Sequence, residues 1–319
     1  MPKGENQYNR IVSMQVISVI NYKGGVGKTT LTANIAGELA YRGYDVLMID
    51  LDPQASLTFS FLQPEVWRKE VAPIKTIKNW FSTKKKERSK NFNQLIISPI
   101  AVNDALDGRG TLDLVSSHLE LINVDLELAT QLGGVDIQQI GEKYVKVHRR
   151  LKEGLDQIPK EAYDYVIIDC PPNFNIVTKC AIVASDFVLI PAKPDYLSTM
   201  GIDYLKASVD KLVKDYNDFC TKHNEEEDDE FQLIEPEVVG VVFTMVQYYG
   251  GVPISACRQY IEKTKELGFP VFENYMRENK TMYADAPRYG LPVVLSYKRS
   301  HSDIVREIES IVDELEVKL

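Results

Sequence analysis

A glycine-rich turn between an apolar run and a helical pattern constrains the fold of this chain more than any other feature. Residues 15–21 (Gln-Val-Ile-Ser-Val-Ile-Asn) are mostly apolar and β-branched, which is typical of a strand buried on both faces of a parallel sheet. The turn that follows holds three glycines: Gly24, Gly25 and Gly27. An apolar-periodic helix is then expected from about Thr29 to Tyr41, closed near Gly43. This order of elements predicts a loop that holds phosphate groups.

The chemistry of the turn predicts a nucleotide site. Glycines let backbone N–H groups face inward around phosphate oxygens, and the helix start adds its partial positive charge. We expect Lys28 to bridge the β- and γ-phosphates of ATP, and the Thr29 hydroxyl to bind Mg²⁺. The residues expected to surround the nucleotide phosphates are Lys23, Gly24, Gly25, Val26, Gly27, Lys28, Thr29 and Thr30.

One position departs from the common phosphate-loop pattern. In G-x-x-x-x-G-K-[ST], Tyr22 stands where the first glycine belongs, and a lysine, Lys23, follows it. The turn therefore carries two lysines, Lys23 and Lys28, on either side of its glycines.

Carboxylates follow two other apolar runs. Asp50 ends the run 46–50 and Asp52 follows it, so strand alternation puts both side chains on the same side. At the carboxyl edge of a parallel sheet they would face a bound ligand. Asp169 ends the apolar run 166–168, which is the arrangement of a strand-end aspartate that holds Mg²⁺. This pattern predicts Thr29 and Asp169 as metal-binding residues.

Alternating apolar runs and helical patterns predict the fold class. Strands are expected at 46–50, 165–169, 187–190 and 238–243, with a shorter candidate at 112–115. Helices are expected at 119–131, 143–157, 198–219, 253–267 and 303–317. This alternation favours an α/β fold with a doubly wound, mostly parallel sheet flanked by helices.

The chain is expected to form one domain with a tail. Residues 1–13 are polar and lack the apolar core of a secretory signal. Residues 14–319 are expected to form a single domain with surface insertions near 64–95, which includes the basic run 84–90, and near 221–231, which includes the acidic run 224–230.

Charge and cysteine content limit the possible functions. The net charge of −9 excludes a generally cationic surface, so nucleic-acid contact would need a local patch. No apolar run approaches the roughly 20 residues of a membrane span. Four scattered cysteines suggest neither a disulfide framework nor a metal site. A cytoplasmic protein is the expectation.

These motifs resemble those of the ParA/MinD family of deviant Walker A P-loop ATPases. The resemblance rests on Lys-Gly-Gly-Val-Gly-Lys-Thr-Thr at 23–30, Asp-Leu-Asp-Pro-Gln at 50–54 and Asp-Cys-Pro-Pro at 169–172. It extends through 188–191 and 285–293, and it favours the ParA branch. Only 13 residues precede Met14, so the N-terminal helix-turn-helix of some members is not expected.

The resemblance implies roles that the residues alone do not. It implies an ATP-dependent sandwich homodimer in which Lys23 reaches the partner's nucleotide and acts with Lys28 in catalysis. Asp52 would position the attacking water, with Asp50 close to the Mg²⁺. The adenine would lie near Thr244, Met245 and Met276. Hydrolysis would be slow until a small adaptor protein stimulates it.

The resemblance favours an ATPase that partitions a cargo (a plasmid, a chromosome origin or a protein assembly) while bound to nonspecific DNA on the nucleoid. Arg277 and Lys280 are the candidate DNA contacts. A MinD-like membrane-surface role would need a basic amphipathic helix at the C-terminus, but residues 306–319 are acidic, so no membrane contact is expected. A monomeric P-loop phosphotransferase would leave Lys23 unexplained. A reductase related to the nitrogenase iron protein would need a second cysteine suitably placed beside Cys170.

Overall fold

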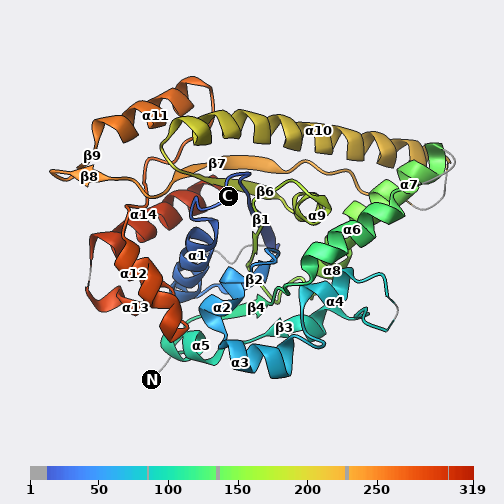
Figure 1. Cartoon of the computed structure of the whole chain (residues 1–319), viewed down its shortest axis with the longest axis horizontal. Helices are drawn as coiled ribbons and strands as arrows, with labels where there is room; N and C mark the ends of the chain where they lie inside the picture. Colours follow the sequence, from blue (N-terminus) through green and yellow to red (C-terminus); the bar gives the residue numbers. More distant parts are fainter. Residues whose placement is uncertain (1–12, 85, 134–136, 227–229, 301) are drawn as a thin grey trace.

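A seven-stranded sheet organises the chain in the computed structural model, which describes residues 13–84, 86–133, 137–226, 230–300 and 302–319 (Figure 1). Its order is β3-β4-β2-β5-β1-β6-β7. The strands are β1 (Gln15–Val19), β2 (Asp45–Asp50), β3 (Ile96–Ile97), β4 (Thr111–Val115), β5 (Tyr165–Asp169), β6 (Phe187–Ala192) and β7 (Glu237–Phe243). Only β3 pairs antiparallel to its neighbour in this sheet. The predicted doubly wound, mostly parallel sheet is confirmed.

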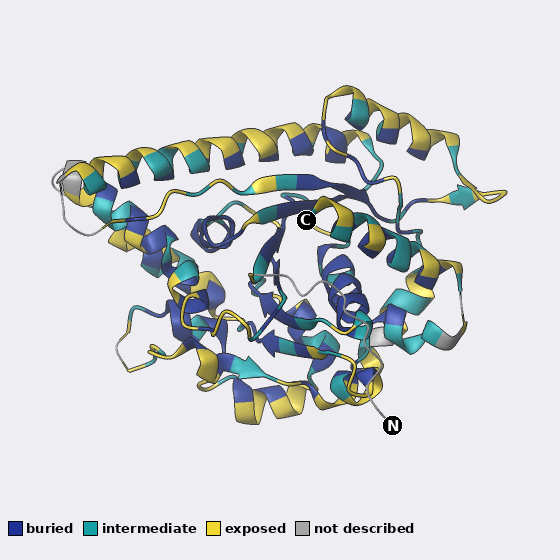
Figure 2. Ribbon diagram, turned by 180° about the vertical axis from the view of Figure 1, so that it is seen from behind, coloured by how far each residue is buried: buried dark blue, intermediate teal, exposed yellow. Residues whose placement is uncertain are grey.

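Helices cover both faces of the sheet (Figures 1 and 2). On one face lie α1 (Lys28–Arg42), α2 (Ser56–Phe61), α5 (Ile100–Leu106) and α14 (Asp303–Lys318). On the other lie α4 (Ile77–Phe81), α6 (Leu121–Gln131), α8 (Arg150–Leu155), α9 (Ile176–Val183), α10 (Tyr196–Glu226) and α11 (Ser255–Glu266). Helix α7 (Ile137–His148) packs between α9 and α10.

Short elements complete the chain. They are α3 (Pro64–Val66), η1 (Trp67–Val71), η2 (Phe92–Leu95), α12 (Lys280–Asp285), η3 (Ala286–Tyr289), α13 (Val293–Ser296) and η4 (Lys298–Ser300). Strands β8 (Tyr248–Tyr249) and β9 (Val252–Pro253) form a separate two-stranded ribbon.

Strand alternation divides the core into two layers. In β1, Ile17 packs in the layer under α1, whereas Val16 packs in the layer under α9 and α10. Both faces are buried, so the central strands contain few polar residues, and this is why the sequence showed them as continuous apolar runs.

Most helix ends follow the sequence expectation. Helix α1 ends at Arg42, and Gly43 adopts a left-handed cap with φ 106°. The helix expected over 143–157 is instead two helices, α7 and α8, which Arg149 separates. Helix α10 extends beyond the expected 198–219 and spans 31 residues. The polar tail 1–12 and residues 227–229 of the acidic run lie outside the described residues.

The C-terminal helix packs on the core. One face of α14 is buried: Ile304, Val305, Ile308, Ile311, Val312 and Leu315. Within the described ranges, no helix combines the length and the apolar character that crossing a bilayer requires.

The segment 64–95 packs against the body of the domain. It folds into α3, η1, α4 and η2, and its aromatic side chains are buried: Trp67, Trp80, Phe81 and Phe92. The Arg150 guanidinium is also buried, donates to the backbone carbonyls of Trp80 and Ser82, and so holds the segment to α8. Single aromatic residues at irregular spacing fill separate gaps, and hydrophobic periodicity does not reveal such packing.

Candidate functional site

The glycine-rich turn leaves the carboxyl end of β1 and leads directly into α1. Gly25 and Gly27 have φ values of 68° and 78°, a backbone conformation that side-chain-bearing residues rarely adopt. Gly27 is also the N-cap of α1, so no side chain occupies the N–H groups at the helix start. These N–H groups are available to an anion, as the sequence predicted for a phosphate loop.

Lys28 lies across the inside of this turn. Its side chain is buried, and Nζ donates to the carbonyl oxygens of Asn21 and Lys23, each at 3.2 Å. Burial lowers the pKa of Lys28, while the nearby carboxylates of Asp169 and Asp52 oppose this shift. The structure thus holds one ammonium group in the space that the turn encloses.

Two buried carboxylates end adjacent strands at the same edge of the sheet as this turn. Asp50 and Asp169 are the last residues of β2 and β5, and they are direct partners in the strand register. Burial, together with the charge of neighbouring aspartates, raises the pKa of Asp50 to about 7 and that of Asp169 well above its usual value.

The oxygen atoms of this pair suit a divalent cation. Thr29 Oγ1 donates to Asp169 Oδ2 at 2.7 Å, and Asp169 Oδ1 is buried with no hydrogen-bond partner among the described residues. An unpaired buried carboxylate oxygen is costly unless a cation neutralises it. A hydroxyl and two carboxylates are the hard donors that Mg²⁺ prefers, so the predicted metal residues fit the group.

Asp52 stands at the edge of the same cluster. Its backbone N–H donates to Asp50 Oδ1 at 3.0 Å, and its half-buried carboxylate accepts from the backbone of Gln54 at 2.9 Å. The structure therefore places Asp52 beside the buried pair and closer to solvent.

Two residues that the sequence analysis missed hold these aspartates. Thr58 donates to Asp50 Oδ2 through its backbone N–H and its hydroxyl, at 2.8 and 2.7 Å. Ser117 donates through Oγ to the backbone carbonyl of Asp52 at 2.7 Å, and through its N–H to Thr58 Oγ1 at 2.9 Å. A Ser-Ser pair directly after the strand at 111–115 was the available signal, because it falls on the same carboxyl edge.

Lys23 contacts its own chain. Its Nζ lies 2.8 and 2.9 Å from the two carboxylate oxygens of Asp195 and 3.2 Å from Ser198 Oγ, at the start of α10. Burial alone would raise the pKa of Asp195. The hydrogen bonds from Lys23 and Ser198 have the larger effect and hold this pKa below its usual value. The Lys23 side chain is 34% exposed, and an ion pair this accessible to water can be exchanged at small cost.

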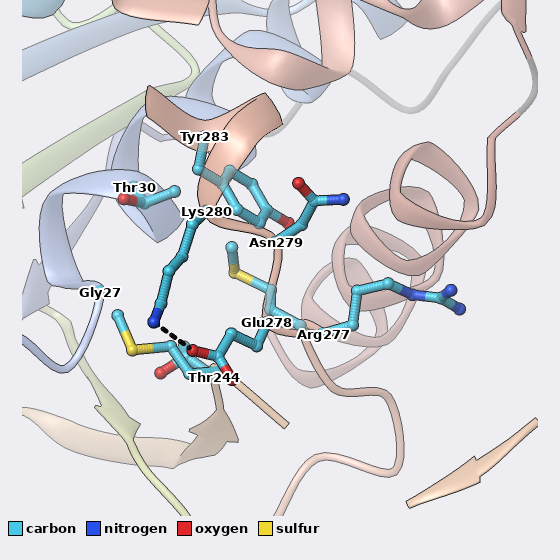
Figure 3. Close-up of a pocket in the computed structure, with 10 residues that line it drawn as sticks. Gly27, Thr30, Thr244, Arg277, Glu278, Asn279, Lys280 and Tyr283 are labelled. Atoms are coloured by element: carbon cyan, nitrogen blue, oxygen red, sulfur yellow. Dashed lines mark ion pairs between the residues drawn. The ribbon is translucent and has the colours of Figure 1, made fainter. Parts of the chain in front are cut away.

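A pocket of ≈ 130 Å³ adjoins the phosphate loop (Figure 3). Gly27 and Thr30 form its loop side, and the three predicted adenine contacts line it as well: Thr244, Met245 and Met276. Thr244 Oγ1 donates to the carbonyl of Val26 at 2.7 Å, which ties the pocket wall to the loop. The structure thus brings the predicted phosphate and adenine residues into one continuous site.

The two predicted DNA contacts differ in their surroundings. Arg277 extends away from the pocket and pairs with Glu307 and Asp303 of α14 at 2.8 and 3.1 Å (Figure 3). The Lys280 side chain is 89% exposed and lies 3.5 Å from Glu278. The α14 carboxylates compensate the charge of the partly buried Arg277, whereas the Lys280 ammonium, beside Glu278, is largely exposed to solvent.

Comparison with known proteins agrees with this geometry. A family model described as an AAA domain matches residues 14–221. The sporulation initiation inhibitor protein Soj of Bacillus subtilis is 29% identical over 92% of this chain and 98% of its own. The chain belongs to the ParA/MinD-type P-loop ATPases. Among them, the chromosome partitioning protein ParA of Caulobacter vibrioides is 25% identical over 88% of this chain and 87% of its own.

Other relatives are matched over part of their length. An uncharacterized protein of Methanocaldococcus jannaschii is 36% identical, and the match spans 66% of it. A putative replication protein A of Rhizobium rhizogenes is 32% identical, and the match spans 46% of it.

Solved structures share the fold at low sequence identity. McdA of Cyanothece in complex with ATP has a TM-score of 0.67 and 21% identity, over 95% of this chain and 97% of that one. A plasmid partition protein of Borrelia burgdorferi bound to AMPPNP has a TM-score of 0.64 and 21% identity, over 96% of this ParA/MinD-type chain and 100% of that one. Cobyrinic acid a,c-diamide synthase of Mycobacterium smegmatis, with ADP and magnesium, has a TM-score of 0.61 and 20% identity, over 91% and 98%.

Proposed function

We propose that this ParA/MinD-type ATPase partitions or positions a cargo in the cell. ATP drives it to dimerise, the dimer holds DNA on the nucleoid without sequence preference, and a small adaptor protein stimulates hydrolysis. The observation that carries the proposal is Lys23, an accessible second lysine at the mouth of the phosphate loop. Soj, ParA and the plasmid partition protein support it through their names and their coverage of nearly the whole chain.

In this proposal each charged residue of the site has one task. Lys28 would contact the β- and γ-phosphates, and its burial strengthens that contact because little water screens it. Thr29, Asp50 and Asp169 would hold Mg²⁺, which when bound neutralises negative charge on the phosphates. Asp52 would orient the attacking water, since its carboxylate is the most accessible of the three aspartates in the site.

Lys23 would make hydrolysis depend on dimerisation. In the single chain its ammonium is held by Asp195, close to the loop but paired with its own protomer. On pairing, the triphosphate of the second protomer would offer a stronger anionic partner than one carboxylate. A cation supplied by the neighbour acts as an arginine finger does, so activity requires the dimer.

A membrane-surface role has less support. Such a role needs an amphipathic helix whose apolar face is free to enter the bilayer. The apolar face of α14 is buried in the core, from Ile304 to Leu315.

Co-sedimentation with duplex DNA tests the proposal. The chain is mixed with DNA at low salt and with a slowly hydrolysed ATP analogue or with ADP, and DNA is expected to retain it only with the ATP analogue. Lys28→Ala should lose ATP binding and therefore DNA binding, whereas Asp52→Ala should stay on DNA with ATP because hydrolysis is slow. A wild-type chain that dimerises with ATP but ignores DNA at low salt would overturn the proposal.

A further inference from the structure

Helix α6 carries an apolar stripe that no described part of the chain covers. Leu119, just before the helix, and Ile122 and Leu126 within it are 55%, 64% and 69% exposed. Their spacing of three and four residues aligns them along one side of the helix. The opposite side packs in the core through Leu121, Val124 and Leu128. An aligned row of exposed aliphatic residues is a feature of interaction surfaces.

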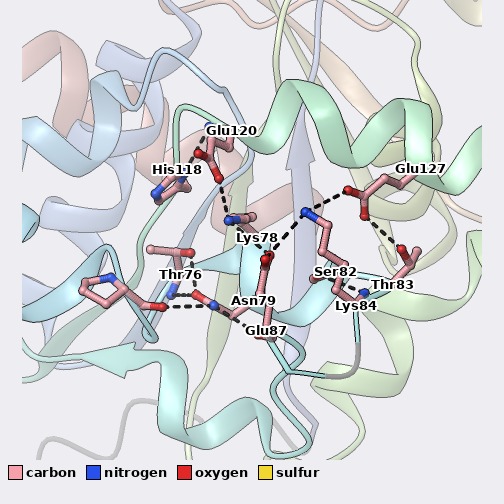
Figure 4. A network of polar contacts seen from close by, with 11 residues as sticks. Thr76, Lys78, Asn79, Ser82, Thr83, Lys84, Glu87, His118, Glu120 and Glu127 are labelled. Carbon is pink, nitrogen blue, oxygen red and sulfur yellow. Dashed lines mark hydrogen bonds and ion pairs between the residues drawn. The ribbon is translucent and has the colours of Figure 1, made fainter.

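Lysines of α4 and of the loop after it meet carboxylates along one flank of α6 (Figure 4). Lys78 pairs with Glu120 at 2.6 Å and with Glu87 at 3.4 Å, and Lys84 lies 3.7 Å from Glu127. The α6 carboxylates on this flank, Glu120 and Glu127, are therefore already compensated.

Three more cations of the loop remain exposed. Lys86, Arg88 and Lys90 have no carboxylate within ion-pair distance among the described residues. In a chain of net charge −9, the loop that contacts α6 through Thr83 and Lys84 therefore forms a local positive edge.

Hydrogen bonds link the start of the stripe to Asp50, which ends β2, and to Asp52 in the loop that follows. Ser117, two residues before Leu119, donates to the Asp52 carbonyl and to Thr58, which in turn donates to Asp50. On the other side, the Trp67 indole donates to Ser116 at 2.8 Å and stacks near the His118 ring at 5.4 Å. A shift at the start of α6 would therefore move the backbone that positions Asp52.

We propose that the α6 stripe and the described loop residues 82–84 and 86–90 dock an amphipathic helix with acidic flanks, belonging to the adaptor that stimulates hydrolysis. The proposal rests on the proposed function. The aliphatic row requires an apolar face, which duplex DNA does not offer, and the positive edge selects acidic flanks by charge complementarity. Binding there would act on hydrolysis through Ser117 and Asp52.

A synthetic peptide serves as the probe for this surface. It is a helical peptide with leucine at every third and fourth position and glutamate on both flanks of the leucine row. One comparison peptide has lysine in place of glutamate, and another has the same residues in scrambled order. Binding to the full chain with ATP is followed by fluorescence anisotropy, and ATP turnover is measured alongside.

Two variants should each weaken binding of the glutamate peptide about tenfold or more. One is Ile122→Asp with Leu126→Asp, and Leu126→Ser is its milder form. The other is Lys86→Glu with Arg88→Glu and Lys90→Glu, which should also gain affinity for the lysine peptide. The matched control reverses three exposed lysines of α10, outside the proposed surface: Lys211→Glu, Lys214→Glu and Lys222→Glu.

Support requires both losses, an unchanged control and faster ATP turnover with the glutamate peptide alone. Equal peptide affinity across all variants would overturn the docking site. Loss of ATP-driven dimerisation in the stripe variant would overturn the docking site in favour of a contact with a second copy of the chain. Loss of DNA retention in the loop variant, with peptide affinity kept, would assign the positive edge to DNA. If wild type ignores DNA while the peptide results hold, the proposed function fails and the docking site stands.

Discussion

At the scale of single residues, the site is a group of charges that the fold keeps partly out of water. Asp50 and Asp169 are forced together because they end neighbouring strands in register. Among the described residues neither forms an ion pair, and Lys28 contacts carbonyl oxygens in place of a carboxylate. Such an arrangement costs stability in the protein alone and favours binding of a cation and a phosphate.

Asp169→Asn should stabilise the nucleotide-free protein at pH 8. The folded pKa values of Asp50 and Asp169 are raised, so above about pH 4 the folded state binds protons that the unfolded state releases. The contribution of this pair to the free energy of unfolding therefore falls as the pH rises from about 4 through 7. Removing one carboxylate should raise the free energy of unfolding by about 1–3 kcal/mol at pH 8.

Urea unfolding in EDTA at pH 5 and pH 8 measures this effect. The gain should be smaller at pH 5, and Mg²⁺-dependent ATP binding should be lost. Asp52→Asn is the matched control, because its carboxylate is half-exposed and should change stability little. A loss of stability at pH 8 in Asp169→Asn would contradict the interpretation of the pair.

The Lys23–Asp195 pair gives a second prediction at this scale. Lys23→Ala should impair ATP-driven dimerisation and hydrolysis much more than ATP binding, because the ammonium would act on the other protomer. Asp195→Asn keeps the lysine but weakens its partner in the same chain, so dimers should form at lower ATP concentration. Light scattering over an ATP series, with labelled ATP for affinity, distinguishes the two effects. Equal loss of ATP affinity in Lys23→Ala would indicate a role within one protomer.

At the scale of elements, buried strands and amphipathic helices were readable from the sequence. Strand β5 and the capped end of α1 lie where the pattern placed them, because both faces of a parallel strand are apolar and Gly43 tolerates a left-handed conformation. The two-residue β3 is too short to show alternation. The hydrogen bond from Ser117 to the Asp52 carbonyl was also not predicted, because it joins residues 65 positions apart through tertiary contact.

A substitution of Arg150 tests how the segment 64–95 is held to α8. The Arg150 guanidinium is buried, burial lowers its pKa to about 10, and it donates to the carbonyls of Trp80 and Ser82. Arg150→Ala should leave these carbonyls unpaired and destabilise the protein by about 2–4 kcal/mol. Limited trypsin digestion should also cut the loop 82–90 sooner.

Arg149→Ala provides the comparison. Arg149 is half-exposed and its guanidinium lies 5.6 Å from the Phe231 ring, so its removal should cost below about 1 kcal/mol. Similar losses of stability in both variants would show that the buried hydrogen bonds of Arg150 do not hold the segment.

At the scale of the whole molecule, the sheet gathers all the predicted nucleotide residues at one edge. The phosphate loop, Asp50, Asp169 and the pocket beside Thr244 all follow the carboxyl ends of parallel strands. Because the net charge is −9, any DNA contact would need a local group of exposed cations. Lys280 lines the pocket and is exposed, whereas the charge of Arg277 is used to hold α14.

A pair of substitutions separates these two roles. Lys280→Glu should weaken DNA binding by the ATP form for all sequences and reduce the slope of log affinity against log salt by about 1 for each DNA phosphate that is no longer neutralised. Its unfolding should match wild type, because the side chain is almost fully exposed.

Arg277→Gln should instead lower stability by about 1 kcal/mol, since Glu307 loses its partner, and should leave the salt slope unchanged. Filter binding over a salt series and thermal unfolding measure both quantities on the same samples. A flattened salt slope in Arg277→Gln with normal stability would return the DNA contact to Arg277, because DNA would then have displaced the α14 carboxylates as its partner.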